Sequence, residues 1–434
     1  MPIQIHIPML VRSLVFHFEG TLPNEVKFLM EDFRVAANNA IRVGLQSRVT
    51  SRNALNKIAY HDFRQEHPNM HSKHLVSAFE VAGSALKNHR RRLRKKLPAK
   101  IPYIRRLFMK AENQAYKLDR KSGVLNLPIR AGCHVKLKLI LSDYHRRYLD
   151  DESLSLGSLT LLPDRAVIAI RKHPPTSYFP ESVLSLDTNE RSLDGILAKD
   201  ERIERIVKAE YPEVAVIQER HYMRRKKLQK KKAHDRRTMK GLCGKEGRRE
   251  HHRVDYRLHQ TANAVLSFAE ENRSAIVLED LTGIRPQMSR EMNRRISVWP
   301  RRKLHQIIEY KAAWKGIPVV KVNPSYSSRK CPACGRIQGS RKGTEFVCVC
   351  GWHIDRHINA SINLLKTAAP ERAAGGLRFG PGASQHDVVM ILCGRKSVRS
   401  EPNGMSGVRA ATVTPPPDNV QNLFNSDCGD SVPP

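Results

Sequence analysis

Four cysteines between residues 331 and 350 place the strongest constraint on how this chain can fold. Cys331 and Cys334 form a Cys-x-x-Cys knuckle, and Cys348 and Cys350 form a tighter Cys-x-Cys knuckle. A glycine follows each pair directly, which suits a turn that wraps its backbone around a metal ion. Four thiolates in about 20 residues are a typical ligand set for a structural zinc ion.

Two alternatives compete with zinc, namely four unrelated buried cysteines or two disulfides. Half of the chain's eight cysteines gather in this segment, and nothing else in the sequence indicates an oxidising compartment. We therefore predict a zinc ribbon. The polar residues Asp355, His357, Asn359 and Asn363 follow it on a helix-like pattern. The ribbon is thus predicted to be an insert that delivers a polar helix start into the rest of the fold.

The balance of charges narrows the class of partner. The chain of 434 residues holds 76 Lys and Arg against 42 Asp and Glu, a formal net charge of +34. Such an excess is typical of proteins that bind a polyphosphate, so nucleic acid is the favoured partner. An anionic membrane is the competitor, but no apolar run could span a bilayer and residues 1–19 lack the pattern of a signal peptide. We expect no membrane partner and a reducing, intracellular location.

Two basic clusters are the candidate phosphate contacts. A cluster of this kind can also be an ordinary solvated helix face. The first consists of Arg90, Arg91, Arg92, Arg94, Lys95 and Lys96. The second consists of Arg224, Arg225, Lys226, Lys227, Lys230, Lys231, Lys232, Arg236 and Arg237.

The apolar pattern changes near residue 180. Before this point the pattern predicts strands at 3–18, 135–141, 159–162 and 166–170 and helices over 24–46 and 51–96. After it, the pattern predicts strands at 183–187, 192–197, 275–280 and 317–322 and helices at 214–239, 251–271 and 298–315. Strands that alternate with helices favour an α/β layer with a central sheet, here preceded by β-rich and helical modules. The Pro, Gly and Ser content at the end of the chain predicts a disordered tail.

Carboxylates stand at the ends of the later strands. Asp187 ends one strand, Glu279 lies at the end of another, and Asp355 opens the helix after the ribbon. Adjacent strand ends and a helix start can bring such groups together to hold two divalent cations about 4 Å apart. Hard oxygen ligands favour Mg²⁺ or Mn²⁺. Each acid alone could equally be a solvated or capping carboxylate.

The segment from Thr261 to Leu365 resembles the transposon-encoded TnpB (OrfB) nucleases, relatives of the type V CRISPR effectors. It contains the strings IVLEDL, CPACG, CVCGW and DRHINASINL. The resemblance implies a RuvC-like (RNase H-type) nuclease domain over residues 181–368, interrupted by a zinc ribbon at about 327–352. It also implies a wedge-like β module over 1–180 with a helical recognition insertion at about 47–97. Residues 369–434 lie beyond the resemblance and form the predicted tail.

The resemblance also implies a function, that of an RNA-guided DNA endonuclease in a prokaryotic cytoplasm, associated with the nucleoid. A guide RNA from the transposon end would pair with target double-stranded DNA, while the protein holds the heteroduplex by its backbone. Asp187 and Glu279 match the family's first two catalytic carboxylates, which bind magnesium. His357 stands where the family usually has its third, so Asp355 is the predicted replacement.

Two other functions stay open. A guided DNA-binding protein that has lost cleavage is favoured by His357, because an imidazole lacks the negative charge that Mg²⁺ favours. A DNA-only transposase or accessory protein is disfavoured by the match across the carboxylate strands. A cleavage assay distinguishes the RNA-guided endonuclease from the guided DNA-binding protein. A requirement for RNA distinguishes both of these from the DNA-only protein. The oligomeric state cannot be predicted from these patterns.

Overall fold

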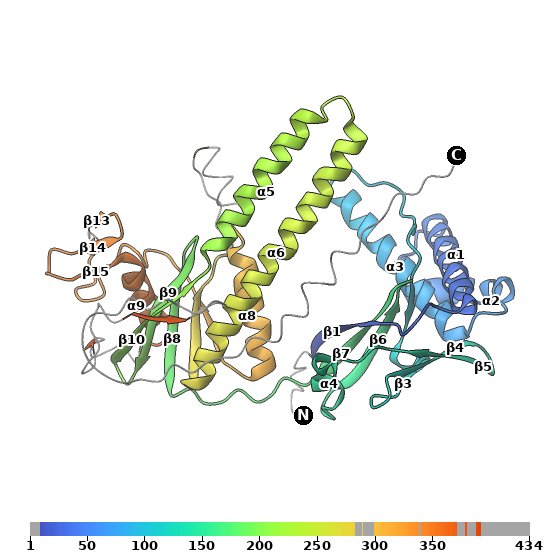
Figure 1. The fold of residues 1–434 in the computed structure, drawn as a ribbon, viewed down its shortest axis with the longest axis horizontal. Coiled ribbons are helices and arrows are strands. Elements are labelled where there is room, and N and C mark those ends of the chain that lie inside the picture. Colours follow the sequence, from blue (N-terminus) through green and yellow to red (C-terminus); the bar gives the residue numbers. More distant parts are fainter. Residues whose placement is uncertain are drawn as a thin grey trace. The chain divides into compact units, whose positions relative to one another are not determined.

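A computed structural model of the protein describes residues 9–282, 289, 299–337, 340–370, 378–379 and 388–391. Two compact units divide the chain into residues 1–174 and 175–434 (Figure 1). This division lies close to the change of pattern near residue 180. The individual domain boundaries stay predictions.

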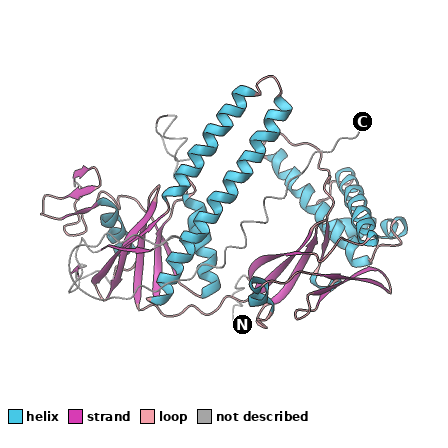
Figure 2. Ribbon diagram, in the orientation of Figure 1, coloured by secondary structure: helices cyan, strands magenta, loops and turns pink. Residues whose placement is uncertain are grey.

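The N-terminal unit combines two antiparallel sheets with three long helices (Figure 2). Its sheets have the strand orders β1-β7-β6-β2 and β3-β4-β5. The strands are β1 (Leu10–His17), β2 (Met109–Ala111), β3 (Lys117–Leu118), β4 (Val124–Arg130), β5 (Cys133–Lys138), β6 (Ser155–Leu161) and β7 (Arg165–Lys172). The helices are α1 (Asn24–Gln46), α2 (Arg52–Glu66), α3 (Ser72–Arg94), α4 (Asp143–Leu149) and the 3-10 helix η1 (Asn113–Ala115).

Most elements predicted for this unit are confirmed. Helix α1 has the predicted bounds, and the strands predicted at 159–162 and 166–170 belong to β6 and β7, which pair antiparallel as a hairpin. The helical pattern over 51–96 is two helices, because α2 ends at Glu66 and a new cap forms at His71, whose ring accepts from the N–H of Lys73. Of the strand predicted at 3–18, residues 1–8 lie outside the described residues.

The C-terminal unit is built on a mixed sheet with the strand order β12-β11-β8-β9-β10-β16, and β17 also pairs with β10. Strands β8, β9 and β10 form an antiparallel meander, whereas β11 and β12 continue the sheet in parallel with β8. The strands are β8 (Ser182–Thr188), β9 (Ser192–Lys199), β10 (Arg202–Glu210), β11 (Ser274–Glu279), β12 (Val319–Val322), β16 (Arg378–Phe379) and β17 (Val388–Ile391). The helices are α5 (Pro212–Lys231), α6 (Arg236–Glu271), α8 (Arg301–Lys315) and α9 (Arg356–Ala368). A small separate sheet joins β13 (Ser340–Lys342), β14 (Glu345–Val347) and β15 (His353–Asp355).

Helices cover both faces of this central sheet (Figure 1). On one face, Leu184 and Leu186 of β8 belong to a core that includes residues of α6 and α8. On the opposite face, Val183 and Val277 belong to a core that includes residues of α9. Because both faces are covered, every residue of β8 is buried and the strand shows no alternation of apolar and polar exposure. The predicted α/β layer is therefore confirmed.

The predicted helix over 214–239 is wrong in its extent. Helix α5 ends at Lys231, a turn follows, and α6 begins at Arg236 with the side chain of Asp235 as its cap. The two helices pack together as a long hairpin (Figure 2). Basic residues continue through the turn, so the composition of this segment carries no sign of the break.

The sequence pattern does not predict strand β10. Because of this strand, the disorder predicted for the tail is wrong in part. Charged residues interrupt its apolar pattern, which hides the strand in the sequence. The strands β16 and β17 pair with it in parallel, and Phe379 packs against the core that contains α9. For these residues the predicted disorder is wrong, because the edge of β10 offers backbone groups that need partners. The rest of the tail from residue 371 lies outside the described residues.

Candidate active site and metal centre

A row of charged side chains crosses the central sheet on the face that α9 covers. The strand registers pair Lys208 of β10 with Asp194 of β9, and Asp194 with Asp187 of β8. Glu279 ends β11, one position beyond a residue that pairs with β8, and so lies next to Asp187. All four share this face, because apolar residues two or four positions away on the same strands pack in the core of α9. The structure thus brings together the two carboxylates at the predicted strand ends.

Asp187 and Glu279 are buried in contact with each other. Each keeps 8% of its surface exposed. Burial raises the pKa of Glu279 strongly, and the charge and hydrogen bond of Asp187 add to this rise. The N–H of Thr188 and the guanidinium of Arg301 act in the opposite sense without cancelling it. Two buried acids in this state favour a cation between them, and their oxygens suit Mg²⁺ or Mn²⁺.

His305 of α8 holds the ends of both acid-bearing strands. Its Nε2 lies 2.8 Å from Oγ1 of Thr188, and its ring also hydrogen-bonds the backbone carbonyl of Glu279. Burial, with the nearby charge of Lys321, lowers the pKa of His305 to about 4. The ring is therefore neutral at pH 7, so it can donate from one nitrogen and accept at the other. Sequence reasoning missed this residue, because nothing in the pattern around it separates it from other polar residues of the helix.

The start of α9 adds two more side chains. Nδ1 of His357 lies 2.8 Å from Oδ2 of Asp187. Asp355 caps the helix, and its Oδ1 accepts from the N–H of His357 at 2.7 Å and from that of Ile358 at 3.3 Å. The cap uses Oδ1 and leaves Oδ2 outside it. His357, rather than Asp355, therefore contacts Asp187 directly, and the role of Asp355 as a ligand stays a prediction.

The four cysteines converge on one point. Their Sγ atoms all lie within 4.8 Å of one another, with Cys331 to Cys350 and Cys334 to Cys348 each at 3.6 Å. Sulfurs around a tetrahedral zinc ion, at about 2.3 Å from it, lie about 3.8 Å apart, so this donor set fits zinc. Among the described residues, no other group of three or more such ligand atoms is already assembled. The acidic site would therefore need a cation to draw its oxygens together.

The predicted glycine turns are also confirmed. Gly335 and Gly351 have φ values of 75° and 87°, which side chains with a Cβ rarely adopt. Each glycine N–H donates back to the carbonyl of a cysteine, Gly335 to Cys331 at 2.9 Å and Gly351 to Cys348 at 3.0 Å. The backbone is thus folded tightly around the sulfur cluster.

Two asparagines of α9 connect the ribbon to the helix. Nδ2 of Asn359 and Nδ2 of Asn363 donate to the carbonyl of Lys330, at 3.0 and 2.7 Å. Lys330 directly precedes Cys331. Nε1 of Trp352 donates to Oδ1 of Asn359 at 3.2 Å, from the other side of the ribbon. Helix α9, which Asp355 caps, and the cysteine ribbon therefore depend on each other for their positions.

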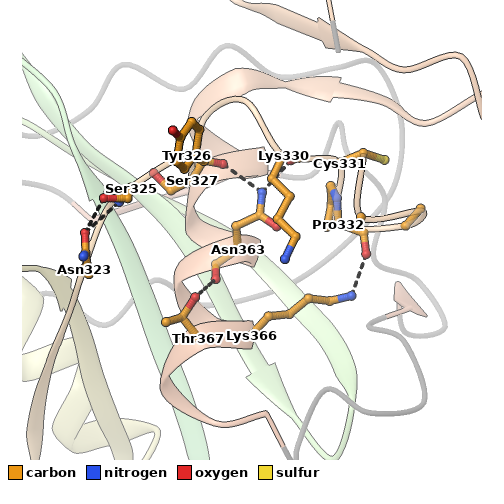
Figure 3. A pocket seen from close by; sticks show the side chains of 12 residues that line it. Asn323, Ser325, Tyr326, Ser327, Lys330, Cys331, Pro332, Asn363, Lys366 and Thr367 are labelled. Atoms are coloured by element: carbon orange, nitrogen blue, oxygen red, sulfur yellow. Dashed lines mark hydrogen bonds between the residues drawn. The ribbon is translucent and has the colours of Figure 1, made fainter. Parts of the chain in front are cut away.

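A polar cavity of about 350 Å³ lies at this junction (Figure 3). Lys330 and Lys366 are among the residues that line it, and Nζ of Lys366 donates to the carbonyl of Pro332 at 2.6 Å. Burial, together with the charge of Lys330, lowers the pKa of Lys366. This contact adds a fourth link between α9 and the ribbon.

The predicted basic clusters lie at the ends of helices. The basic residues of 90–96 are all exposed at the end of α3 and just after it. The second cluster is divided between α5, the turn and the start of α6. Arg224 and Arg225 form ion pairs with Glu246 and Glu250 of α6, so they hold the hairpin together, whereas most lysines of this cluster are exposed.

None of the helices in the described part of the chain combines the length and apolar character that crossing a bilayer requires.

Comparison with known proteins relates this site to a family. Residues 302–364, from α8 to α9, match the family described as Cas12f1-like, TNB domain, and residues 29–124 match the Uncharacterized protein MJ0013 family. The chain is 29% identical to the TnpB-like protein MJ0751 of Methanocaldococcus jannaschii over 254 residues, 55% of this chain and 91% of that protein. It is 34% identical to the CRISPR-associated endodeoxyribonuclease Cas12f2 of a Micrarchaeota archaeon over 132 residues, 26% of this chain and 24% of that protein.

A further relative and a solved structure agree with these matches. The TnpB-like protein aq_aa05 of Aquifex aeolicus is 30% identical over 154 residues, 34% of this chain and 48% of that protein. The cryo-EM structure of a Cas12f1-sgRNA-target DNA complex is similar with a TM-score of 0.53 and 11% identity, over 82% of this chain and 98% of that chain. At this identity the likeness shows the fold alone. The chain is thus similar to TnpB-like proteins over 55% of its length and, in residues 302–364, to the miniature type V Cas12f effectors.

Proposed function

We propose that this protein is an RNA-guided DNA endonuclease that hydrolyses DNA at a RuvC-like site formed by Asp187, Glu279 and Asp355. The observation that carries this proposal is the buried contact of Asp187 with Glu279 at the ends of two adjacent parallel strands. Two carboxyl groups are rarely buried in contact with each other unless a cation or a proton lies between them. The name of the relative Cas12f2, an endodeoxyribonuclease, supports the same chemistry.

Each residue of the site would have a separate role in the reaction. Bound Mg²⁺ or Mn²⁺ would supply an activated water and stabilise the leaving oxygen. Asp187 and Glu279 offer hard oxygen ligands from rigid strands. Asp355 offers Oδ2, because its other carboxylate oxygen, Oδ1, caps the helix. His305 keeps the two strand ends in register, and His357 orients Asp187 through their 2.8 Å contact. The zinc ribbon would hold the start of α9 over the sheet.

The proposed partners are a guide RNA from the transposon end and target double-stranded DNA. A net charge of +34 suits a protein that holds a heteroduplex by its phosphates, in the cytoplasm beside the nucleoid. The similar solved structure is a complex of Cas12f1 with an sgRNA and a target DNA, which supports this pair of partners.

A second candidate function is guided DNA binding without cleavage. It is favoured by His357, which occupies the position next to Asp187 and brings no negative charge. The two candidates share their RNA and DNA partners and differ only in hydrolysis.

The decisive experiment begins with the RNA that co-purifies with the protein. Its sequence gives the guide, from which a matching DNA target is made and incubated with the complex and Mg²⁺ or Mn²⁺. We expect cleavage that is lost after RNase treatment or without divalent ions. Guided binding without cleavage would favour the second candidate, and RNA-independent cleavage would favour a DNA-only enzyme.

The lysines of the second basic cluster test how RNA is held. Gln substitutions at Lys226, Lys227, Lys230 and Lys231 remove charge and spare the paired Arg224 and Arg225. Each phosphate contact that the substitutions remove should make the slope of log affinity against log salt shallower by about 0.7 to 0.9. Gln substitutions at four exposed lysines outside both basic clusters and outside the predicted insertion at 47–97 serve as the control: Lys27, Lys117, Lys136 and Lys199. An unchanged slope in the first set would make the cluster an ordinary solvated surface.

A further inference from the structure

Asp194 is a fourth acid at the proposed site, buried like Asp187 and Glu279, and has no part in the function as described so far. It is the direct register partner of Asp187 across β8 and β9, and 7% of its surface is exposed. Side chains in such pairs begin from Cβ atoms about 4.5 to 5.5 Å apart, and like charges placed this way are destabilising. A buried pair of aspartates therefore requires an explanation.

The two oxygens of Asp194 have different surroundings. Oδ2 accepts hydrogen bonds from Oγ of Ser192, at 2.9 Å, and from Nδ2 of Asn189. Oδ1 is buried, and within the described part of the chain no hydrogen-bond donor reaches it. The hydrogen bonds to Asn189 and Ser192 support the turn between β8 and β9, and they explain the position of Oδ2 but not that of Oδ1. The unpartnered Oδ1 remains costly in this structure unless a further ligand is bound.

The strand registers place Asp194 at the acidic site rather than behind it. Burial raises the pKa of Asp194, while Ser192, Lys208 and His357 act in the opposite sense. Asp194 shares the face that α9 covers, because Ile196 and Ala198 of the same strand pack in the core of α9, and His357 at the start of that helix contacts Asp187. Lys208, the neighbour on the other side, is held by Glu210 at 3.1 Å. Asp194 thus lies between a lysine that is already paired and the proposed metal carboxylates.

We propose that Asp194 is a further metal ligand of this site and binds through Oδ1 beside Asp187. The inference rests on the proposed two-cation function. Two divalent cations bring more positive charge than Asp187, Glu279 and Asp355 together neutralise, and His357 adds no negative charge. A fourth carboxylate on the same face restores that balance, and the cation in turn removes the repulsion between the paired aspartates.

Manganese alone is the probe for this proposal. Thermal unfolding of the full chain with its RNA is followed at rising Mn²⁺ concentration, for wild type and for Asp194→Asn. Asparagine keeps the size of the side chain and an oxygen that accepts from Ser192. Without divalent ions the variant should unfold at a higher temperature, because a like-charge repulsion is gone. Its Mn²⁺ affinity, read from the rise in unfolding temperature, should fall by about tenfold or more, as for other changes around metal ligands.

Three further variants make the result specific. Asp200→Asn removes the same charge from an exposed position just after β9 and should change neither quantity. Asp194→Glu, which keeps the charge, should retain more Mn²⁺ affinity than Asp194→Asn and covers the case in which Asn does not fold. In the double variant of Asp194→Asn with His357→Asp, a new carboxylate next to Asp187 should recover both Mn²⁺ binding and cleavage.

The contrary results are distinct. If Asp194→Asn keeps the wild-type response to Mn²⁺ while Asp187→Asn loses it, Asp194 only supports the β8 to β9 turn and the inference is wrong. If Asp187→Asn also keeps the wild-type response, the proposed metal site itself fails, and the inference fails with it.

Discussion

Replacing Asp187 or Glu279 by Ala should abolish guided DNA cleavage and leave guided DNA binding near its wild-type level. These carboxylates are buried at strand ends and belong to neither basic cluster, so their loss disables chemistry rather than phosphate contacts. Metal assistance contributes several kcal/mol, and each step of about 1.4 kcal/mol is tenfold in rate, so we expect a decrease of about 10³-fold or more. Single-turnover cleavage and a filter-binding assay on the same complexes measure the two effects separately.

The third ligand position requires a variant that separates two roles of Asp355. Asp355→Ser retains a good helix cap and removes the carboxylate, so folding should be kept while cleavage falls as it does for Asp187→Ala. His357→Asp should keep or raise cleavage. A different pattern would identify a natural binder: wild-type protein binds guided DNA without cutting at any Mg²⁺ or Mn²⁺ concentration, and His357→Asp switches cutting on.

Loss of zinc should unfold the ribbon and release the start of α9. Cys331→Ser removes one of four sulfurs that lie within 4.8 Å of one another. Structural zinc contributes about 10 to 16 kcal/mol in small peptides, comparable with the whole stability of a typical domain, about 5 to 15 kcal/mol. Because Asn359 and Asn363 bind the backbone next to Cys331, we expect cleavage to be lost together with the metal. Metal analysis should give one zinc per wild-type chain, and amide hydrogen exchange should show reduced protection in α9.

Two variants control for this result. Cys243→Ser, in α6 and outside the ribbon, should keep zinc and cleavage. Asn363→Ala should keep zinc but weaken protection at the start of α9, because the sulfurs are untouched while one of the two links to Lys330 is removed. Folded wild-type protein that contains no zinc would contradict the assignment of the ribbon.

Local chemistry made several features predictable from the sequence. The four cysteines could be recognised as a candidate zinc site because all four lie within about 20 residues and thiolates in paired knuckles have few other uses. The strands that carry Asp187 and Glu279 could be placed because apolar runs between polar segments are a local pattern. The order of these elements along the chain then put both acids at strand ends, where the structure has them.

The tertiary structure alone decided which side chains meet. Asp194 becomes part of the acidic row only through the register of β8 with β9, since a shift of one residue would turn it to the other face. His305 reaches Thr188 only because α8 packs over the sheet, 117 positions further along the chain. At the start of α9, successive residues point about 100° apart, so helix packing determines that His357 contacts Asp187 while Asp355 caps. Such contacts depend on non-local pairing and packing, which no local pattern of residues records.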